Sequence, residues 1–391
     1  MIPTKMETIE YVFLGFLISK IAGHMARRLN INEATGYLAT AILLGLTLGR
    51  GEYIRDLMLI SNVAAIFVVF YAGVSSDLET VIENFKSSTM ISLLSVAFTM
   101  VSVLLAVTYI GFPLESAFII ALLLSNTATE TVSMIIKGLP IHIKSILVSA
   151  SFVDDLFMLF AASAYYTWYV TGDISNVVLP ILVSMALTIL VLAILSRRQS
   201  ILKNMFIYMS RDIAFFTDIA LLLLSLMLLV AYVSGVSPFI AAYLAGIFIS
   251  GGIWMHDPML RYRTRINDFT SILSTIIDGV FTPLFMLYVG LHITVSAINT
   301  LLFVLLLVIG LSVKTLVYFS FFKLRGEETF TSLAAGASMT GRGVLELTLL
   351  VKGFELGVVS LEIFNTVVAV ALSTIIASIM FVSLLSRKGF S

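Results

Sequence analysis

The 391-residue chain contains no cysteine and carries little charge. The absence of cysteine excludes disulfide scaffolds, thiolate metal sites and cysteine nucleophiles. Only 12% of the residues are charged, about half of the roughly 25% that a soluble domain carries. The 23 Lys and Arg residues are balanced by 23 Asp and Glu, so no basic excess suggests a nucleic-acid partner. Because 59% of the chain is hydrophobic, these absences leave a polytopic membrane protein.

Long apolar runs divide the chain into candidate membrane spans. A helix that crosses a bilayer needs about 20 mostly apolar residues. Short connections leave no room for a soluble domain, so we expect residues 1–391 to form one all-α transmembrane domain of about thirteen helices. The expected spans are 10–26, 34–49, 57–76, 87–111, 116–137, 143–170, 177–196, 212–234, 237–253, 270–291, 298–322, 329–351 and 360–385.

The basic residues predict an orientation. Cytoplasmic loops of membrane proteins are enriched in Lys and Arg. With the N-terminus outside, sixteen of the 23 basic residues fall on the cytoplasmic side and only four fall on the outer side. We therefore expect a multi-pass protein of the cell membrane, with its N-terminus outside and its C-terminus in the cytoplasm.

Three short segments recur in the two halves of the chain. Tyr37–Gly45 resembles Tyr243–Gly251, Tyr71–Gly73 resembles Tyr288–Gly290, and Asn126–Glu130 resembles Ser338–Arg342. Each match falls in the corresponding span of its half. The pattern predicts a six-helix repeat over 10–170, a linker helix over 177–196 and a second repeat over 212–385. Because seven crossings separate the repeats, the second runs in the opposite direction, as in many secondary transporters.

A few charges lie inside these spans. Asp154 and Asp155 stand well within an apolar helix, where each ionised acid costs roughly 2.5–3.5 kcal/mol, so a loop edge is the weaker interpretation. Adjacent helix residues point about 100° apart, so one carboxylate can face a cation on another helix while the other faces a water-filled cavity. Lys314 is the candidate cation, since an isolated lysine in the membrane needs a partner unless it snorkels to the surface.

Two spans contain polar or glycine-rich interruptions. Ser125–Thr131 is a run of small hydroxyl and amide residues that ends near Glu130, and it reads either as a polar helix face or as a helix break lining a cavity. Its repeat mate, Gly336–Gly343, holds three glycines and Arg342, which makes a break there more favourable. Broken helices would place dipole ends in the membrane, where Glu130 and Arg342 have suitable charges to meet them.

This combination resembles the sodium/proton antiporters of the NapA and NhaA type, within the monovalent cation:proton antiporter superfamily. The double aspartate is the most specific element, and the resemblance covers nearly the whole chain. Supporting segments are Gly36–Gly45, Ser237–Gly246 and Pro283–Leu291. Two positions depart from the pattern: Gly341 stands where relatives often have Pro, and the acid that often follows the Arg-Gly pair directly is here Glu346.

The resemblance implies an NhaA-like fold with two crossing, discontinuous helices. It implies a homodimer in which a core (87–170 and 298–385) slides against a dimerisation scaffold (10–76 and 212–291) as an elevator. Asp155 becomes the principal ion-binding carboxylate and Asp154 the partner of Lys314. The remaining expected site residues are Asn126, Thr127, Thr129, Glu130, Ser151, Thr340, Arg342 and Glu346.

The expected function is secondary antiport of protons against sodium or lithium, with proton and cation competing for Asp155 and Asp154. Electroneutral relatives often carry Asn-Asp where this chain has Asp154 and Asp155, so the chain resembles the electrogenic members of the superfamily. We expect the protein to have no enzyme activity and no cofactor, and to bind neither ATP nor nucleic acid. Its expected partners include the membrane lipids around it. A potassium/proton antiporter is the nearest alternative, and a sodium-coupled symporter for an organic solute is a weaker one. An intramembrane aspartyl protease is disfavoured because its Gly-x-Gly-Asp motif is absent.

Overall fold

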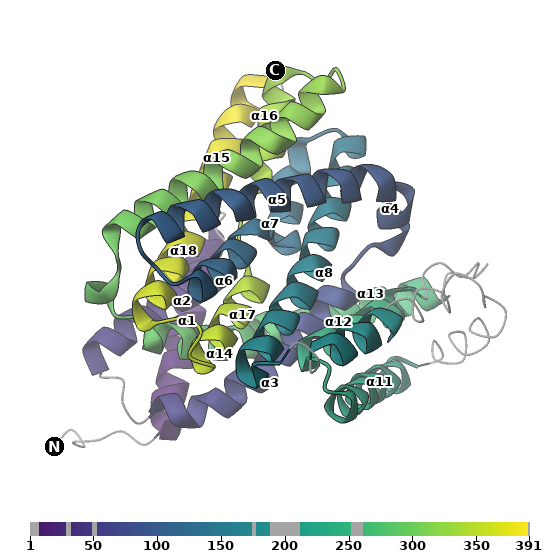
Figure 1. The fold of residues 1–391 in the computed structure, drawn as a ribbon. Coiled ribbons are helices and arrows are strands. Elements are labelled where there is room, and N and C mark those ends of the chain that lie inside the picture. Colours follow the sequence, from purple (N-terminus) through teal and green to yellow (C-terminus); the bar gives the residue numbers. More distant parts are fainter. Residues whose placement is uncertain are drawn as a thin grey trace. The chain divides into compact units, whose positions relative to one another are not determined.

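A computed structural model describes residues 8–28, 33–48, 53–173, 177–187, 212–251 and 261–389. All regular structure in these ranges is helical (Figure 1). The helices of the first half are α1 (Thr8–Arg28), α2 (Glu33–Leu48), α3 (Tyr53–Val74), α4 (Leu78–Glu83), α5 (Phe85–Tyr109), α6 (Leu114–Ser125), α7 (Thr129–Ile135) and α8 (Ile141–Thr171). Those of the second half are α11 (Ile213–Ser234), α12 (Pro238–Ser250), α13 (Arg261–Ile276), α14 (Thr282–His292), α15 (Thr300–Leu324), α16 (Thr329–Ser338), α17 (Val344–Glu355) and α18 (Leu361–Gly389).

Seven of the described helical stretches are long and apolar enough to cross a membrane. They are Leu57–Val74, Phe85–Tyr109, Ile141–Thr171, Ile213–Ser234, Tyr262–His292, Thr300–Leu324 and Leu361–Val382. Shorter apolar helices include Glu33–Leu46, Leu114–Ser125, Val177–Leu187 and Pro238–Ser250. The all-helical, polytopic membrane fold is therefore confirmed, and the count of thirteen crossings stays a prediction. Residues 188–196 of the expected linker helix lie outside the described part.

One span begins earlier than the sequence suggests. The helix expected at 270–291 begins at Arg261 and continues through a π-helical turn, Ile277–Phe281, into α14. Its first turns carry Arg261, Arg263 and Arg265, so hydropathy alone places the start too late. A π-turn inserts one extra residue into the helical ladder without ending the helix.

The described chain divides into two compact units. One comprises residues 1–62, 80–158 and 282–391, and the other comprises 63–79 and 159–281. In the first unit, α15 packs against α5, α16 and α18, and α2 packs against α1 and α14. In the second unit, α11 packs against α12 and α13.

Two of the recurring segments pair across the halves in the same manner. In the first unit, Gly290 of α14 lies directly against the main chain of α2 at Ala41 and Ile42. In the second unit, Gly246 of α12 lies against the main chain of α3 near Gly73. Each half thus supplies one member of each close helix pair, and the six-helix repeat itself stays a prediction.

The first unit contains two interrupted helices. The span expected at 116–137 is split into α6 and α7 by residues 126–128, and the span at 329–351 is split into α16 and α17 by residues 339–343. Both polar interruptions are therefore breaks, and the interpretation of Ser125–Thr131 as a continuous polar helix face is wrong.

Candidate functional site

The two breaks are hydrogen-bonded to each other, so they meet at one place in the first unit. The hydroxyl of Thr127 donates to the Met339 carbonyl (2.8 Å), and the Ala128 N–H donates to the Gly341 carbonyl (3.2 Å). The hydroxyl of Thr131, in the first turn of α7, donates to the Arg342 carbonyl (3.1 Å). Main-chain groups freed by a break cannot bond to lipid. Each break therefore provides hydrogen-bond partners for some of the main-chain groups of the other.

Two glycines allow this close approach. A Cβ atom on Gly341 would overlap the side chain of Thr131, and one on Gly343 would overlap the Cβ of Ala128. Gly343 has an extended backbone, a conformation open to any residue, so its glycine is required by space alone. The glycine-rich sequence that predicted the second break thus also explains how the two breaks fit together.

Arg342 closes the end of the opposite half-helix. Its guanidinium donates to the carbonyls of Leu124 and Asn126, at the C-terminal end of α6, and its side chain is buried. The last carbonyls of a helix lack partners within the helix, and their dipoles favour a cation. The sequence predicted that this arginine would meet a helix end, and the structure shows which one.

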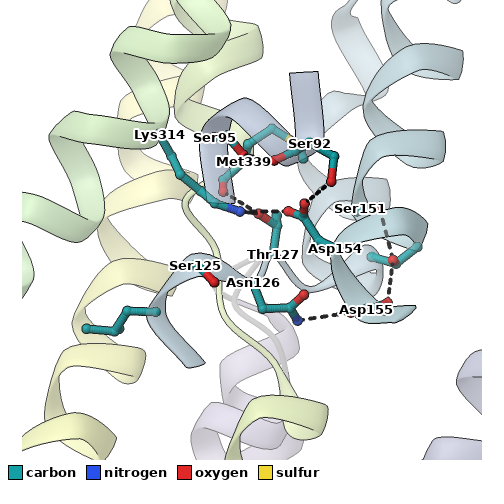
Figure 2. Close-up of polar contacts among 12 residues, drawn as sticks. Ser92, Ser95, Ser125, Asn126, Thr127, Ser151, Asp154, Asp155, Lys314 and Met339 are labelled. Carbon is teal, nitrogen blue, oxygen red and sulfur yellow. Dashed lines mark hydrogen bonds and ion pairs between the residues drawn. The ribbon is translucent and has the colours of Figure 1, made fainter. Parts of the chain in front are cut away.

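Asp154 and Lys314 form a fully buried ion pair. The Lys314 ammonium lies 2.7 Å from Asp154 Oδ2 and also donates to the hydroxyl of Thr127. The other oxygen of Asp154 accepts a 2.6 Å hydrogen bond from Ser92 of α5. Figure 2 shows Asp154 held between Ser92 and Lys314. The cation opposite the aspartate pair is therefore the residue that the sequence indicated.

Asp155 points away from this ion pair and receives only neutral donors. Its Oδ1 accepts from the Asn126 amide at 2.9 Å, and its Oδ2 lies 3.0 Å from the Thr129 hydroxyl. That hydroxyl is also 3.0 Å from Ser151. Among the ion pairs of the described residues, none includes Asp155. The adjacent aspartates thus face different surroundings, as their positions on a helix require.

Glu346 is the third buried carboxylate of the region. Its Oε2 accepts from the Gly343 N–H (2.9 Å), and its Oε1 accepts from the same Asn126 nitrogen that serves Asp155 (3.0 Å). It lies in the first turn of α17, where a carboxylate is favoured by the helix dipole. Glu346, a residue of secondary interest from sequence, therefore lies beside Asp155.

The structure separates the other expected site residues. Asn126, Thr127, Thr129 and Ser151 all reach one of the two aspartates directly or through one contact. The hydroxyl of Thr340 instead donates to the Ala337 carbonyl in the last turn of α16, so it points back to that helix and not to the carboxylates. The backbone of Glu130 lies in α7, but its side chain lies outside the described part.

Ser92 is a site contact that sequence reasoning missed. A signal was present, since Ser88, Ser92, Ser95 and Thr99 recur at helical spacing along one face of α5 and all four are buried. Hydroxyls are common in membrane helices because they bond to the carbonyl one turn earlier. The stripe on α5 therefore did not stand out from the many other serines and threonines of the chain.

Residues 13–387 match the family described as sodium/hydrogen exchanger, transmembrane. A probable Na⁺/H⁺ antiporter 3 of Methanocaldococcus jannaschii is 25% identical over 98% of this chain and 100% of its own length. A Na⁺/H⁺ antiporter of Enterococcus hirae is 24% identical over 99% of this chain and 100% of its own length. The Na⁺/H⁺-K⁺ antiporter GerN of Bacillus cereus is 24% identical over 95% of this chain and 94% of its own length.

The fold also matches a solved structure. The sodium proton antiporter MjNhaP1 from Methanocaldococcus jannaschii, solved at pH 8, superposes with a TM-score of 0.77 at 14% identity, covering 97% of this chain and 98% of that one. The family match spans nearly all of the chain, as the resemblance of the aspartate pair and the Arg-Gly segment predicted. The protein thus belongs to the sodium/hydrogen exchanger family, a family of membrane ion transporters.

Proposed function

We propose that the protein exchanges sodium for protons at Asp155 by alternating access. One observation carries the proposal. Around the two breaks, the buried charged residues of the described part are three carboxylates (Asp154, Asp155, Glu346) and two cations (Lys314, Arg342). One negative charge therefore lacks a fixed counter-charge. Lys314 is paired with Asp154, and Glu346 accepts a main-chain N–H at the start of α17. Asp155 is bonded only to the Asn126 amide and the Thr129 hydroxyl, so we take it as the carboxylate that a mobile ion neutralises.

Competition for Asp155 explains the coupling. An ionised carboxylate without water or a counter-ion is costly inside a membrane protein, so the carrier moves with the group neutralised. A proton neutralises it as –COOH. A sodium ion neutralises it as –COO⁻Na⁺, releasing the proton to water, with further oxygens from Thr129 and Ser151 within reach. Because the proton and the sodium ion exclude each other, the site carries one of them across the membrane and returns with the other.

We further propose that exchange is electrogenic, with two protons for each cation. When Asp154 joins in binding the cation, Lys314 loses its partner and can release a proton. Two protons against one sodium ion move one net charge per cycle. At 100 mV this charge contributes about 2.3 kcal/mol, equivalent to a roughly fortyfold sodium gradient.

Potassium is the second candidate cation. GerN, a relative of similar identity along nearly its whole length, is named for potassium as well as sodium, and hydroxyl, amide and carboxylate oxygens bind either ion. Asp154 favours sodium or lithium, because potassium/proton antiporters of the same superfamily commonly have a neutral amide residue at the position that Asp154 occupies here. A symporter for an organic solute remains a weaker alternative, for which a lysine opposite paired aspartates is not expected.

The setting belongs to the same proposal. The transporter acts in the cell membrane as a homodimer surrounded by lipid, with its N-terminus outside. The core, residues 87–170 and 298–385, carries the aspartate pair, Lys314 and both breaks, while residues 10–76 and 212–291 form the scaffold. It uses the ion gradients alone, without ATP.

The test replaces the proposed ion-binding carboxylate in purified transporter. Asp155→Asn should abolish the dissipation of a preset pH gradient by added Na⁺, Li⁺ or K⁺ in proteoliposomes, because the amide holds neither ion. Asp218→Asn is the matched control, since Asp218 is an exposed aspartate on the membrane helix α11, and it should keep wild-type exchange. Retained exchange in Asp155→Asn would overturn the assignment. A rate that does not respond to membrane potential would overturn the two-to-one stoichiometry.

A further inference from the structure

Glu346 is a buried acid that the exchange mechanism above does not use. A plain interpretation makes it the counter-ion of Arg342, four residues earlier on the same chain. The geometry does not support that pairing, because the Arg342 guanidinium donates to the main-chain carbonyls of Leu124 and Asn126. Among the ion pairs of the described residues, none joins Arg342 to Glu346.

The side-chain partner of Glu346 is the amide of Asn126. One nitrogen atom donates one hydrogen to Glu346 Oε1 (3.0 Å) and the other to Asp155 Oδ1 (2.9 Å). The two carboxylate oxygens therefore lie within about 6 Å of each other, where like charges in a protein interior interact strongly. Two acids from separate helices, α8 and α17, are thus held together by a single residue of the first break.

The carbonyl oxygen of Asn126 supplies a second, independent observation. Asn126 Oδ1 is buried and has no hydrogen-bond partner within the part of the chain that the structure describes. The amide cannot be turned round to satisfy it, since both neighbours of the nitrogen are carboxylates, which accept hydrogen bonds. An unsatisfied buried acceptor is costly, whereas a carbonyl oxygen is a good ligand for a hard cation.

We propose that Glu346 is a second carboxylate of the cation site, joined to Asp155 through Asn126, whose carbonyl oxygen is a neutral ligand of the same ion. This inference rests on the proposed exchange at Asp155. A cation at the site is then attracted by two carboxylates instead of one, and Arg342 compensates the additional negative charge from the far side of the break. Glu346 and Asn126 thereby determine how tightly the site holds the ion.

The first experiment measures the apparent KM for Na⁺ of Glu346→Gln in proteoliposomes. Removing a negative charge at this separation should raise KM about tenfold or more, with a much smaller change in Vmax. The matched control is Glu355→Gln on the same helix, α17. Glu355 is bonded to Tyr288 and Lys352, away from Asp155, so the control should keep the wild-type KM.

A second pair of variants tests the link itself. Asn126→Ala should also raise the KM for Na⁺, and adding Glu346→Gln to it should raise KM by less than the two separate effects combined, because residues in one network are not additive. Ser125→Ala is the matched control, since the neighbouring Ser125 donates only to the Leu122 carbonyl of its own helix. Stabilisation of the purified variants by Na⁺ against heat provides a readout independent of transport.

The outcomes separate the two proposals. If Asp155→Asn is inactive but Glu346→Gln keeps the wild-type KM for Na⁺, the role of Glu346 is overturned and exchange at Asp155 stands. If Asp155→Asn retains exchange, the proposed function itself fails. A purely structural Glu346 would lower the amount of folded protein or Vmax and leave KM unchanged. Should Glu346→Gln fail to fold, an unchanged KM in Asn126→Ala overturns the inference instead.

Discussion

The two breaks lie at matching positions in the two halves of the chain, but they contribute different groups to the site. The first, residues 126–128, contributes side chains: Asn126 reaches two carboxylates, and Thr127 accepts from Lys314. The second, residues 339–343, contributes main chain: the carbonyls of Met339 and Gly341 accept hydrogen bonds from the first break, and the Arg342 carbonyl accepts from Thr131 in the following helix, α7. Its one charged side chain, Arg342, caps the partner half-helix, and no ion pair among the described residues joins it to an aspartate.

The difference shows that two breaks that meet at one place can have different roles. Both breaks expose backbone that must be satisfied within the protein, and the crossing provides this for both. Because the glycine-rich break supplies the main-chain acceptors and the space, the side chains of the other break can face the aspartate pair. The comparison predicts that variants in the second break mainly change stability, while variants in the first mainly change transport.

The largest effect is expected from Arg342→Ala. The carbonyls of Leu124 and Asn126 would lose their buried donors, at about 1–3 kcal/mol for each group. We expect the free energy of unfolding in detergent to fall by about 3 kcal/mol or more, with little folded protein left to assay. Arg342→Lys should restore only part of this, because an ammonium lacks the fixed fork of donors. Wild-type thermal stability in Arg342→Ala would contradict the capping role.

Gly343→Ala should have an intermediate effect. Its new methyl group would overlap the Cβ of Ala128, and overpacking of this kind costs about 1–3 kcal/mol. Thermal unfolding should therefore show a lower midpoint. Ala128→Gly in the same chain removes the overlapping atom and should recover most of the loss. A double variant no more stable than Gly343→Ala would show that the crossing is not limited by this contact.

The smallest effects compare two threonines at matching breaks. Thr127→Val removes a hydroxyl that bonds to both Met339 and Lys314, and we expect exchange to slow about tenfold, or about 1.4 kcal/mol. Thr340→Val removes a hydroxyl that donates to the Ala337 carbonyl of the preceding helix, α16, and stability and exchange should stay within about 0.5 kcal/mol of wild type. Equal losses of exchange in the two variants would contradict the division between the breaks.

Much of the site was predictable because membrane burial makes charge conspicuous. Asp154, Asp155, Lys314 and Arg342 stand out since each is expensive in an apolar helix, and all four are buried in the first unit. Ser92 was missed because a hydroxyl is inexpensive in such a helix and can bond locally. Thr340 was expected at the site from its place in the break, but its hydroxyl donates to the Ala337 carbonyl of the preceding helix, α16.

Residue types along the chain were enough to predict a helical membrane protein, the positions of two helix interruptions, and the charges that need partners inside the membrane. Hydropathy and the cost of buried charge act locally, so they can be read along the chain. The tertiary structure decided which groups meet. Only the crossing of the breaks shows that Arg342 caps α6 and that Asn126 joins Asp155 to Glu346, residues 29 and 220 positions away. Hydrogen bonds of a few ångströms depend on how α6, α8 and α17 pack, and no local pattern encodes that.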